Sequence, residues 1–286
     1  MDNQEALKRL QNEEFDILCM FSDFCDRHGL VWFLESGTCL GAMRHQGFIP
    51  WDDDIDVGML RPEYERFLKL AQDGLPDGYS LHTYRNTLGY SALFAKIYKD
   101  GTVFETQETI DAGCPQGIFI DIFPYDVLAR DEGLRKKQGA NAQRWKIMSY
   151  LYHSPTVRVP GKGVVGALER AACRLAHYGI HSVFKRDSIV EHWERSILKD
   201  TSQQSEEWSI LMGQRIRVFQ EKDLLPTISA YFCGKEFPVP HNVEAVLERV
   251  YGDWRALPAP EDRKTHLPLG LVFSDGSKWH AGAEGV

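Results

Sequence analysis

The sequence predicts an α/β protein of the α+β type, in which a mixed β-sheet core is flanked by helices. Two observations predict this class. Short apolar runs with strand character alternate with helical spacing over the first 126 residues, and residues 134–198 become helical and more basic. We interpret the helical stretch as an insertion or subdomain of one core. The expected units are residues 1–130 as the core, 131–233 as a mostly helical, basic segment, and 234–286 as a C-terminal segment completing the core.

The first elements follow from periodicity and from residues that end helices. A helix is expected over residues 4–28, where apolar residues recur at helical spacing, and Gly29 provides a natural stop. The run 30–36 is short, apolar and aromatic, as in a strand. Residues 37–45 begin with Gly and Thr, which suits a tight turn opening a short helix. A second strand is expected over residues 55–60.

The remaining elements alternate in type. Pro62 favours a first helical turn, so a helix is expected to begin there. Three further runs have the apolar and aromatic content of strands: 79–84, 91–99 and 117–126. Residues 154–163 interrupt the later helical stretch with two prolines and two glycines. We then expect a polar loop over 200–208, a helix near 242–254 and a loose tail from 278.

The composition argues against several classes of protein. The 286 residues have a formal net charge of −8, so no general attraction to nucleic acid is expected. The N-terminus lacks the basic start and apolar centre of a secretory signal, and no run reaches the roughly 18 apolar residues of a membrane span. A cytoplasmic protein is therefore expected. The six cysteines show no CxxC pair, which favours buried thiols over a zinc site.

The stretch GFIPWDDDIDVGML, residues 47–60, crowds four aspartates at the mouth of an expected buried strand. Alternate residues of a strand point the same way, so Asp54 and Asp56 are expected on one face. Neighbouring carboxylates repel each other unless a cation lies between them, and all-oxygen ligands favour Mg²⁺, Mn²⁺ or Ca²⁺ over zinc. We therefore predict a metal site, with Asp52 as a further ligand or outer contact and Asp53 as a turn cap.

Two other interpretations of these acids are weaker. A solvated acidic turn needs neither the alternation nor the apolar run that follows. An EF-hand loop would place Asp52, Asp54 and Asp56 at its first, third and fifth positions. Its sixth position requires glycine for a sharp turn, and Val57 stands there instead.

A two-metal site for phosphoryl transfer explains the acids better. Such a site needs a phosphate cradle and one more carboxylate on a neighbouring strand. Ser36, Gly37 and Thr38 supply a small-residue turn before a helix, whose N–H groups can approach phosphate oxygens. Asp121 stands among apolar residues in FIDIF, where a lone acid is either a ligand or a costly burial.

These segments together resemble one known family. FLESGTCLGAMRHQGFIPWDDDIDVGM followed by GIFIDIFPYD resembles the LicD family, which includes the fukutin and fukutin-related proteins. KEFPVPHNVEAVLERVYGDWRALP resembles its closing segment, so the resemblance covers residues 5–126 and 235–266. The resemblance implies a nucleotidyltransferase-like fold. The positions that match its motif are the turn Ser36-Gly37-Thr38, the pair Asp54 and Asp56, and the later acid Asp121.

The resemblance also implies a reaction. Its members move a substituted phosphate from a CDP-linked alcohol to a hydroxyl of a cell-surface glycan such as teichoic acid or lipopolysaccharide, and release CMP. CDP-choline is the typical bacterial donor, whereas fukutin-like relatives use CDP-ribitol. We expect Asp54, Asp56 and Asp121 to hold Mg²⁺ (or Mn²⁺) while the acceptor hydroxyl attacks in line.

Other functions stay open at this point. One is transfer of NMP from an NTP to a small molecule, sugar or protein, and another is a ribitol or glycerol phosphotransferase. A non-catalytic binding module is a third, although buried acids without a cation would then cost stability.

Further substrate contacts are expected near the motifs. Arg44 is either a phosphate ligand or a surface charge, and His45 is either a phosphate contact or a structural histidine. Lys96 is either an inward phosphate ligand or a solvent-facing strand residue. Glu35 is expected to orient a hydroxyl or the metal shell, or to form a salt bridge.

Two features bear on the choline headgroup and the acceptor. A quaternary ammonium favours an aromatic cage, for which Trp51 and Tyr125 are the candidates. The basic segment 135–174 is a solvated helical face, an interfacial helix on anionic lipids, or a surface for a phosphate-rich acceptor. The second interpretation suits a lipid-linked glycan acceptor and a peripheral position at the inner face of the membrane.

Overall fold

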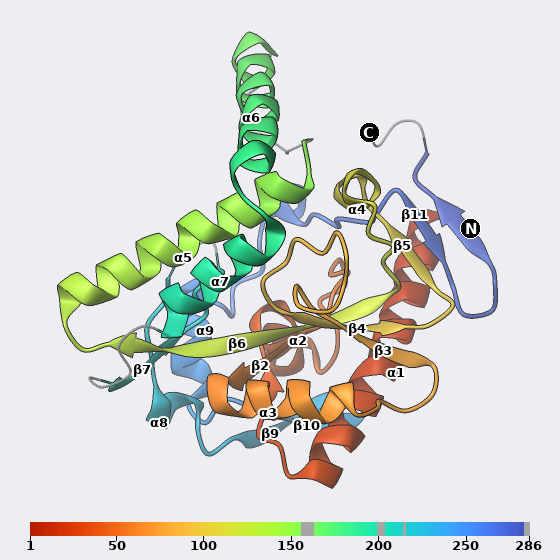
Figure 1. The fold of residues 1–286 in the computed structure, drawn as a ribbon. Coiled ribbons are helices and arrows are strands. Elements are labelled where there is room, and N and C mark those ends of the chain that lie inside the picture. Colours follow the sequence, from red (N-terminus) through yellow and green to blue (C-terminus); the bar gives the residue numbers. More distant parts are fainter. Residues whose placement is uncertain (156–162, 199–203, 214–215, 283–286) are drawn as a thin grey trace.

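The computed structural model describes residues 1–155, 163–198, 204–213 and 216–282. The predicted mixed α/β class is confirmed: a mixed sheet forms the centre, with α5 and α7 on one side of the long strand β6 and α3, β9 and β10 on the other (Figure 1). Most of the expected break at 154–163 lies outside the described residues.

The N-terminal elements closely match the prediction. They are α1 (Asn3–His28), β1 (Phe33–Leu34), α2 (Ser36–His45), β2 (Asp56–Leu60) and α3 (Arg61–Gln72). The Asp2 carboxylate caps α1 by accepting the Glu5 N–H at 2.8 Å. Gly29 ends α1 in the left-handed conformation, at φ 58°. The first strand is shorter than expected, because only two of its residues pair with β2.

The central sheet has the strand order β1-β2-β6-β4-β3, formed with β3 (Tyr79–His82), β4 (Ala95–Lys99) and β6 (Phe119–Ala129). Strands β2 and β6 run parallel, and the other neighbours are antiparallel. The expected loop at 200–208 is wrong over its described part. There β7 (Gln204–Ser209) pairs with β6 and with β8 (Phe219–Gln220), and this pairing makes a polar segment a strand.

The two faces of the β4–β6 pair carry different side chains. On one face, the Lys99 ammonium reaches α1, where it pairs with Asp16 at 2.8 Å and with Glu13. Ile97 and Ile120 are fully buried in the core. The opposite face presents a set of alternating residues, since side chains two positions apart share a face. These are Lys96 and Tyr98 on β4, and Phe119, Asp121 and Phe123 on β6.

The middle segment supplies α5 (Glu132–His153), α6 (Gly163–Val183) and α7 (Arg186–Leu198). The Gln138 amide joins α5 to the end of β6, donating to the Val127 carbonyl at 3.0 Å and accepting from the Ala129 N–H at 3.2 Å. Helix α6 extends away from the sheet and stands clear of the body (Figure 1). No helix within the described ranges is long and apolar enough to cross a membrane.

The C-terminal part folds back onto the core. A short strand β5 (Val103–Glu105) pairs with β11 (Gly270–Val272), which pairs with β12 (Lys278–His280). The tail is therefore ordered from residue 278 to 280, contrary to the expectation, because β12 completes this sheet with Trp279 buried. The other elements are α4 (Gln107–Ala112), α8 (Glu221–Leu224), β9 (Ile228–Phe232), β10 (Lys235–Val239), the expected helix α9 (Val243–Tyr251) and a 3₁₀ turn (Pro260–Asp262).

Candidate active site

Two of the predicted acids lie side by side in the sheet. Asp56 and Asp121 are register partners on the parallel strands β2 and β6. Burial first, and then the carboxylates of Asp52, Asp121 and Asp53, raise the pKa of Asp54 to about 8. Burial and the neighbouring Asp53 raise the pKa of Asp52 to about 7. The structure therefore gathers the predicted acids into one electrostatic cluster.

Lys96 faces this cluster. Its Nζ lies 2.6 Å from Asp121 Oδ1, and both side chains are almost buried. The ammonium also lies 3.3 Å from the centre of the Phe119 ring. Lys96 therefore points inward and not to solvent, its partner is a carboxylate of the cluster, and its contact with phosphate stays a prediction.

The small-residue turn holds the acids in place. The Thr38 hydroxyl accepts the Asp56 N–H at 2.8 Å, and the Glu35 N–H donates to the Asp56 carbonyl at 3.0 Å. Gly37 is required sterically, since a Cβ there would lie 2.6 Å from Asp52 Oδ2. Ser36 begins α2 with a positive φ of 45°. Hydrogen bonds and close packing thus join the turn at residues 36–38 to the acid stretch at residues 52–56.

Glu35 is a buried hydrogen-bond acceptor beneath the turn. Its carboxyl accepts from the Tyr125 hydroxyl at 2.7 Å and from the Ser36 hydroxyl at 3.2 Å. Burial raises the pKa of Glu35, and these hydrogen bonds oppose the rise. The expectation of Tyr125 as an aromatic cage residue is wrong. Its ring is fully buried between Phe33 and Phe219, so its role is to position Glu35.

Arg44 and His45 serve the C-terminal segment. The Arg44 guanidinium donates to the carbonyls of Trp254 at 3.0 Å and Ala256 at 3.3 Å, and to His45 Nε2 at 3.0 Å. These contacts use Nη1 and Nε of Arg44 and give both residues a structural role, while their contact with phosphate stays a prediction. Burial and the Arg44 charge both lower the pKa of His45, which suits its role as an acceptor.

Trp51 and Asp53 also contact the C-terminal segment. The Arg263 guanidinium lies 5.1 Å from the Trp51 ring, and Trp51 borders a cavity near the start of α1. Tyr125 does not line that cavity, so the two proposed cage residues do not share a pocket. The Asp53 carboxylate accepts the His266 N–H at 3.2 Å. Asp53 therefore ties the acid stretch to the C-terminal segment instead of capping only its own turn.

The sequence analysis missed Glu14 of α1. Its side chain is fully buried, and neither carboxyl oxygen has a hydrogen-bond partner among the described residues. Burial raises its pKa well above the usual range, and the charges of Asp54, Asp53 and Asp52 raise it further. The available signal was an acid on the apolar face of the first helix.

Arg217 was also missed. It lines a cavity of about 360 Å³ together with Glu35, Ser36, Phe123 and Phe219. In the described residues its guanidinium makes one weak contact, a 3.4 Å hydrogen bond to the Val250 carbonyl. Guanidinium groups suit phosphate oxygens and base acceptors, and the aromatic wall suits a planar ring. Its surroundings, QRIR, offered no periodicity from which this position could be predicted.

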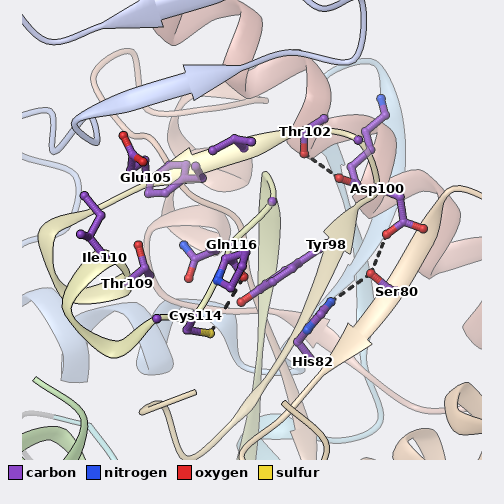
Figure 2. Close-up of a pocket in the computed structure, with 17 residues that line it drawn as sticks. Ser80, His82, Tyr98, Asp100, Thr102, Glu105, Thr109, Ile110, Cys114 and Gln116 are labelled. Carbon is purple, nitrogen blue, oxygen red and sulfur yellow. Dashed lines mark hydrogen bonds between the residues drawn. The ribbon is translucent and has the colours of Figure 1, made fainter. Parts of the chain in front are cut away.

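A larger cavity of about 590 Å³ lies beside β3, β4 and β5, where the central sheet meets the sheet of β5, β11 and β12 (Figure 2). The His82 ring stacks on Tyr98 at 3.8 Å, and Ser80 donates to Asp100 Oδ1 at 2.6 Å. Tyr98 shares its strand face with Lys96. The cavity wall residue Phe104 packs on Phe119, two residues before Asp121. Asp121 thus lies along β6 between the two cavities.

Carboxylate oxygens are the ligands that hard divalent cations prefer, and the metal site stays a prediction. Within the ranges that the structure describes, no three acids, histidines or cysteines stand ready to hold a metal ion. Nevertheless, the pKa values of Asp52, Asp54 and Asp56 are raised by burial and by neighbouring carboxylates. Lys96 forms an ion pair with Asp121 alone. The remaining negative charge is what a bound cation would balance.

An acid cluster on adjacent strands beside a helix N-terminus is typical of enzymes that transfer phosphate-containing groups. Residues 29–165 match the family model for the LicD/FKTN/FKRP nucleotidyltransferase domain. The predicted resemblance to the LicD family is confirmed by this match and by a LicD relative that aligns over nearly the whole chain.

The relatives include bacterial and animal proteins. The chain is 28% identical over 266 residues to the lipopolysaccharide cholinephosphotransferase LicD of Haemophilus influenzae, covering 91% of this chain and 97% of that protein. It is 35% identical over 81 residues to an uncharacterized protein of Rickettsia typhi, which is 26% of each chain. It is 32% identical over 77 residues to the human ribitol-5-phosphate transferase FKTN, covering 26% of this chain and 17% of that protein.

Proposed function

We propose that the protein is a metal-dependent phosphotransferase that moves phosphocholine from CDP-choline to a hydroxyl of a cell-surface glycan and releases CMP. The observation that carries this proposal is the likeness to the Haemophilus cholinephosphotransferase over nearly the whole of both chains. The register pair Asp56 and Asp121 supports it, because it brings two carboxylates of the matched segment together.

The donor diphosphate is assigned to the space between α2 and the acid cluster. Asp54, Asp56 and Asp121 would hold Mg²⁺ (or Mn²⁺), which when bound neutralises charge on the diphosphate and on the departing CMP. Lys96 fixes the orientation of Asp121 through their ion pair. The hydroxyl of Thr38 holds the start of β2 through the Asp56 N–H. A carboxylate of the cluster with a raised pKa is suited to accept the proton of the acceptor hydroxyl.

We assign the donor nucleotide and the acceptor glycan to different cavities. The cavity beside Arg217 receives the nucleotide of the donor, because it combines an aromatic wall, a guanidinium and the start of α2. The cavity beside Tyr98 receives the acceptor glycan, because it lies on the other side of Asp121 along β6. This arrangement would place donor and acceptor on opposite sides of Asp121, as in-line transfer requires.

A donor screen tests the proposal. Purified protein, Mg²⁺ and CDP-choline, CDP-ribitol or CDP-glycerol are incubated with glycan acceptors, and CMP release and acceptor mass are followed. We expect a phosphocholine gain that disappears in Asp54→Ala/Asp56→Ala and persists in Asp187→Ala, whose side chain is 83% exposed. A ribitol phosphate gain would keep the chemistry and change the donor, which the likeness to FKTN makes the second candidate. If no CDP-alcohol is turned over and NTPs yield pyrophosphate, the proposal is wrong and the protein is a nucleotidyltransferase.

Metal dependence has a test that does not require turnover. The melting temperature is measured with EDTA and with increasing Mg²⁺ or Mn²⁺. We expect the cation to raise the melting temperature of the wild type and of Asp187→Ala, but not that of Asp54→Ala/Asp56→Ala. An equal rise in all three proteins would show that the cation does not bind at the cluster.

A further inference from the structure

Helix α6 exposes an apolar face to solvent. Six large apolar side chains of this helix are 60–77% exposed: Val164, Val165, Leu168, Leu175, Tyr178 and Val183. At about 100° per residue, these positions lie within one side of the helix. Alanines, Gly179 and Ser182 fill the rest of that side, and the Ser182 hydroxyl donates to the Gly179 carbonyl at 2.7 Å. Single exposed apolar residues are ordinary, but a continuous stripe on one helix marks an interaction surface.

The opposite side of α6 is the one that this chain covers. His177 contacts the Leu151 carbonyl at 2.8 Å, and His181 contacts the Tyr152 carbonyl at 2.6 Å, both at the end of α5. Ile180 is buried on the same side. The helix is therefore fastened by its polar side, with its apolar side turned outward. Because α6 stands clear of the body, an extended surface can reach that side along the helix (Figure 1).

Charge indicates which kind of surface fits. Arg170 and Arg174 are both exposed, and Lys185 follows the helix. At about 100° per residue, Arg174 borders the Tyr178 edge of the stripe and Arg170 lies further round, toward His177. Glu169 is the single acid between residues 163 and 186, although the whole chain has a net charge of −8. By contrast, the basic residues Arg135 and Lys136 of α5 pair with acids of this chain, namely Glu207 and Glu132. A local positive charge beside an aliphatic stripe complements an anionic lipid surface.

The geometry points to α6 as a membrane-docking helix that lies in the plane of an anionic bilayer, with its apolar face among the acyl chains. Arg174 contacts the lipid phosphates, Arg170 adds positive charge near them, and Tyr178 takes the interfacial position that its ring and hydroxyl favour. This inference is a form of the interfacial-helix interpretation of the basic segment 135–174. It assigns the lipid contact to α6 and not to α5. The inference does not depend on the proposed reaction, since it concerns binding to lipid alone.

Vesicle sedimentation tests the inference without substrate. The full chain is mixed with vesicles of phosphatidylcholine alone, or with about 30 mol % phosphatidylglycerol, at about 0.15 M salt. We expect binding to the anionic vesicles, and a loss of about tenfold or more in Leu168→Asp/Leu175→Asp. Leu88→Asp is the matched control, since Leu88 is 80% exposed outside α6 and should bind as the wild type does. Circular dichroism establishes that the variants keep their helix.

A second variant separates charge from apolar insertion. Arg170→Gln/Arg174→Gln should reduce binding to anionic vesicles about tenfold and leave the weak binding to phosphatidylcholine unchanged. Equal binding by the wild type and Leu168→Asp/Leu175→Asp would overturn the inference. A different combination of results would also overturn it. In that case the wild type sediments with no vesicle, light scattering shows that it is a dimer, and Leu168→Asp/Leu175→Asp is a monomer. That result would assign the stripe to a second copy of the chain.

Discussion

Lys96 Nζ lies 2.6 Å from Asp121 Oδ1, joining β4 to β6 at the residue that separates the two cavities. Both side chains are nearly buried, so the ammonium is the protein's own counter-charge to one acid of the cluster. Removing one partner of a buried pair leaves an uncompensated charge, which costs more than the pair itself contributes.

Lys96→Met should therefore reduce both stability and turnover. We expect a loss of about 3 kcal/mol in the free energy of unfolding and about a hundredfold or more in kcat. Lys136→Met is the matched control, since Lys136 pairs with Glu132 on the surface with 76% of its side chain exposed, and it should change stability by less than about 0.5 kcal/mol. Urea unfolding and steady-state kinetics measure the two effects. Equal stability of the two variants would contradict the buried pair.

Neighbouring glutamates of α1 should respond to substitution with opposite signs. Glu14 is buried without a hydrogen-bond partner in the described residues, whereas Glu13 accepts from the Ser274 N–H at 3.0 Å and pairs with Lys99. Glu14→Met should raise the free energy of unfolding at pH 8 by about 1 kcal/mol, and Glu13→Met should lower it by about the same amount. Parallel urea titrations test this. A loss of stability in both variants would show that Glu14 has a partner it needs.

Without divalent cation, the wild type should lose stability as the pH rises from 5 to 8. The pKa of Asp52 is raised to about 7 and that of Asp54 to about 8, whereas both are near 3.8 when unfolded. The folded state then binds more protons than the unfolded state. The stabilising contribution is complete below about pH 4 and disappears as the pH passes through the folded pKa values.

The measurement is urea unfolding in EDTA between pH 5 and 8.5. The wild type should lose several kcal/mol over this range, and Asp52→Asn/Asp54→Asn should lose much less because it cannot release these protons. Parallel curves for the two proteins would mean that the acids titrate normally. Addition of Mg²⁺ should reverse the trend, because metal ligands bind in their deprotonated form.

The predictable parts of the fold were those with strong local periodicity. The apolar spacing of α1 and the stop at Gly29 located the first helix within a residue, and the acids at the mouth of β2 located the cluster. The strand β7 was missed because QSEEWS is polar, and only its pairing with β6 makes it a strand.

The site was less predictable than the fold, because side-chain partners come from distant segments. Arg44 was expected near phosphate on sequence proximity, yet its donors reach carbonyls 210 and 212 residues away. Tyr125 was expected to be accessible, yet it is buried by Phe219, which lies far along the chain. Arg217 enters the site through tertiary packing alone, which no local pattern reports.

Gly37→Ala should disable the site without unfolding the protein. A Cβ at Gly37 would lie 2.6 Å from Asp52 Oδ2, so the carboxylate must move, while alanine suits the first turn of α2. We expect activity to fall about tenfold or more with a stability change below about 1 kcal/mol. Gly179→Ala of α6, whose Cβ would meet nothing within 4 Å, should gain stability and keep activity. Full activity of Gly37→Ala would mean that the position of Asp52 does not matter.

Arg217 should determine affinity for the donor. Its guanidinium faces the cavity shared with Ser36 and Phe123, and its single hydrogen bond within the described residues is a 3.4 Å contact to a carbonyl. Arg217→Ala should raise the KM for the CDP-linked donor about ten- to a hundredfold and weaken CMP binding in calorimetry by a similar factor, with Arg217→Lys intermediate. Arg195→Ala, which removes an exposed arginine paired with Glu191, should change neither quantity. If CMP binds Arg217→Ala as tightly as the wild type, this cavity does not hold the nucleotide, and the donor must enter from the Tyr98 side of Asp121.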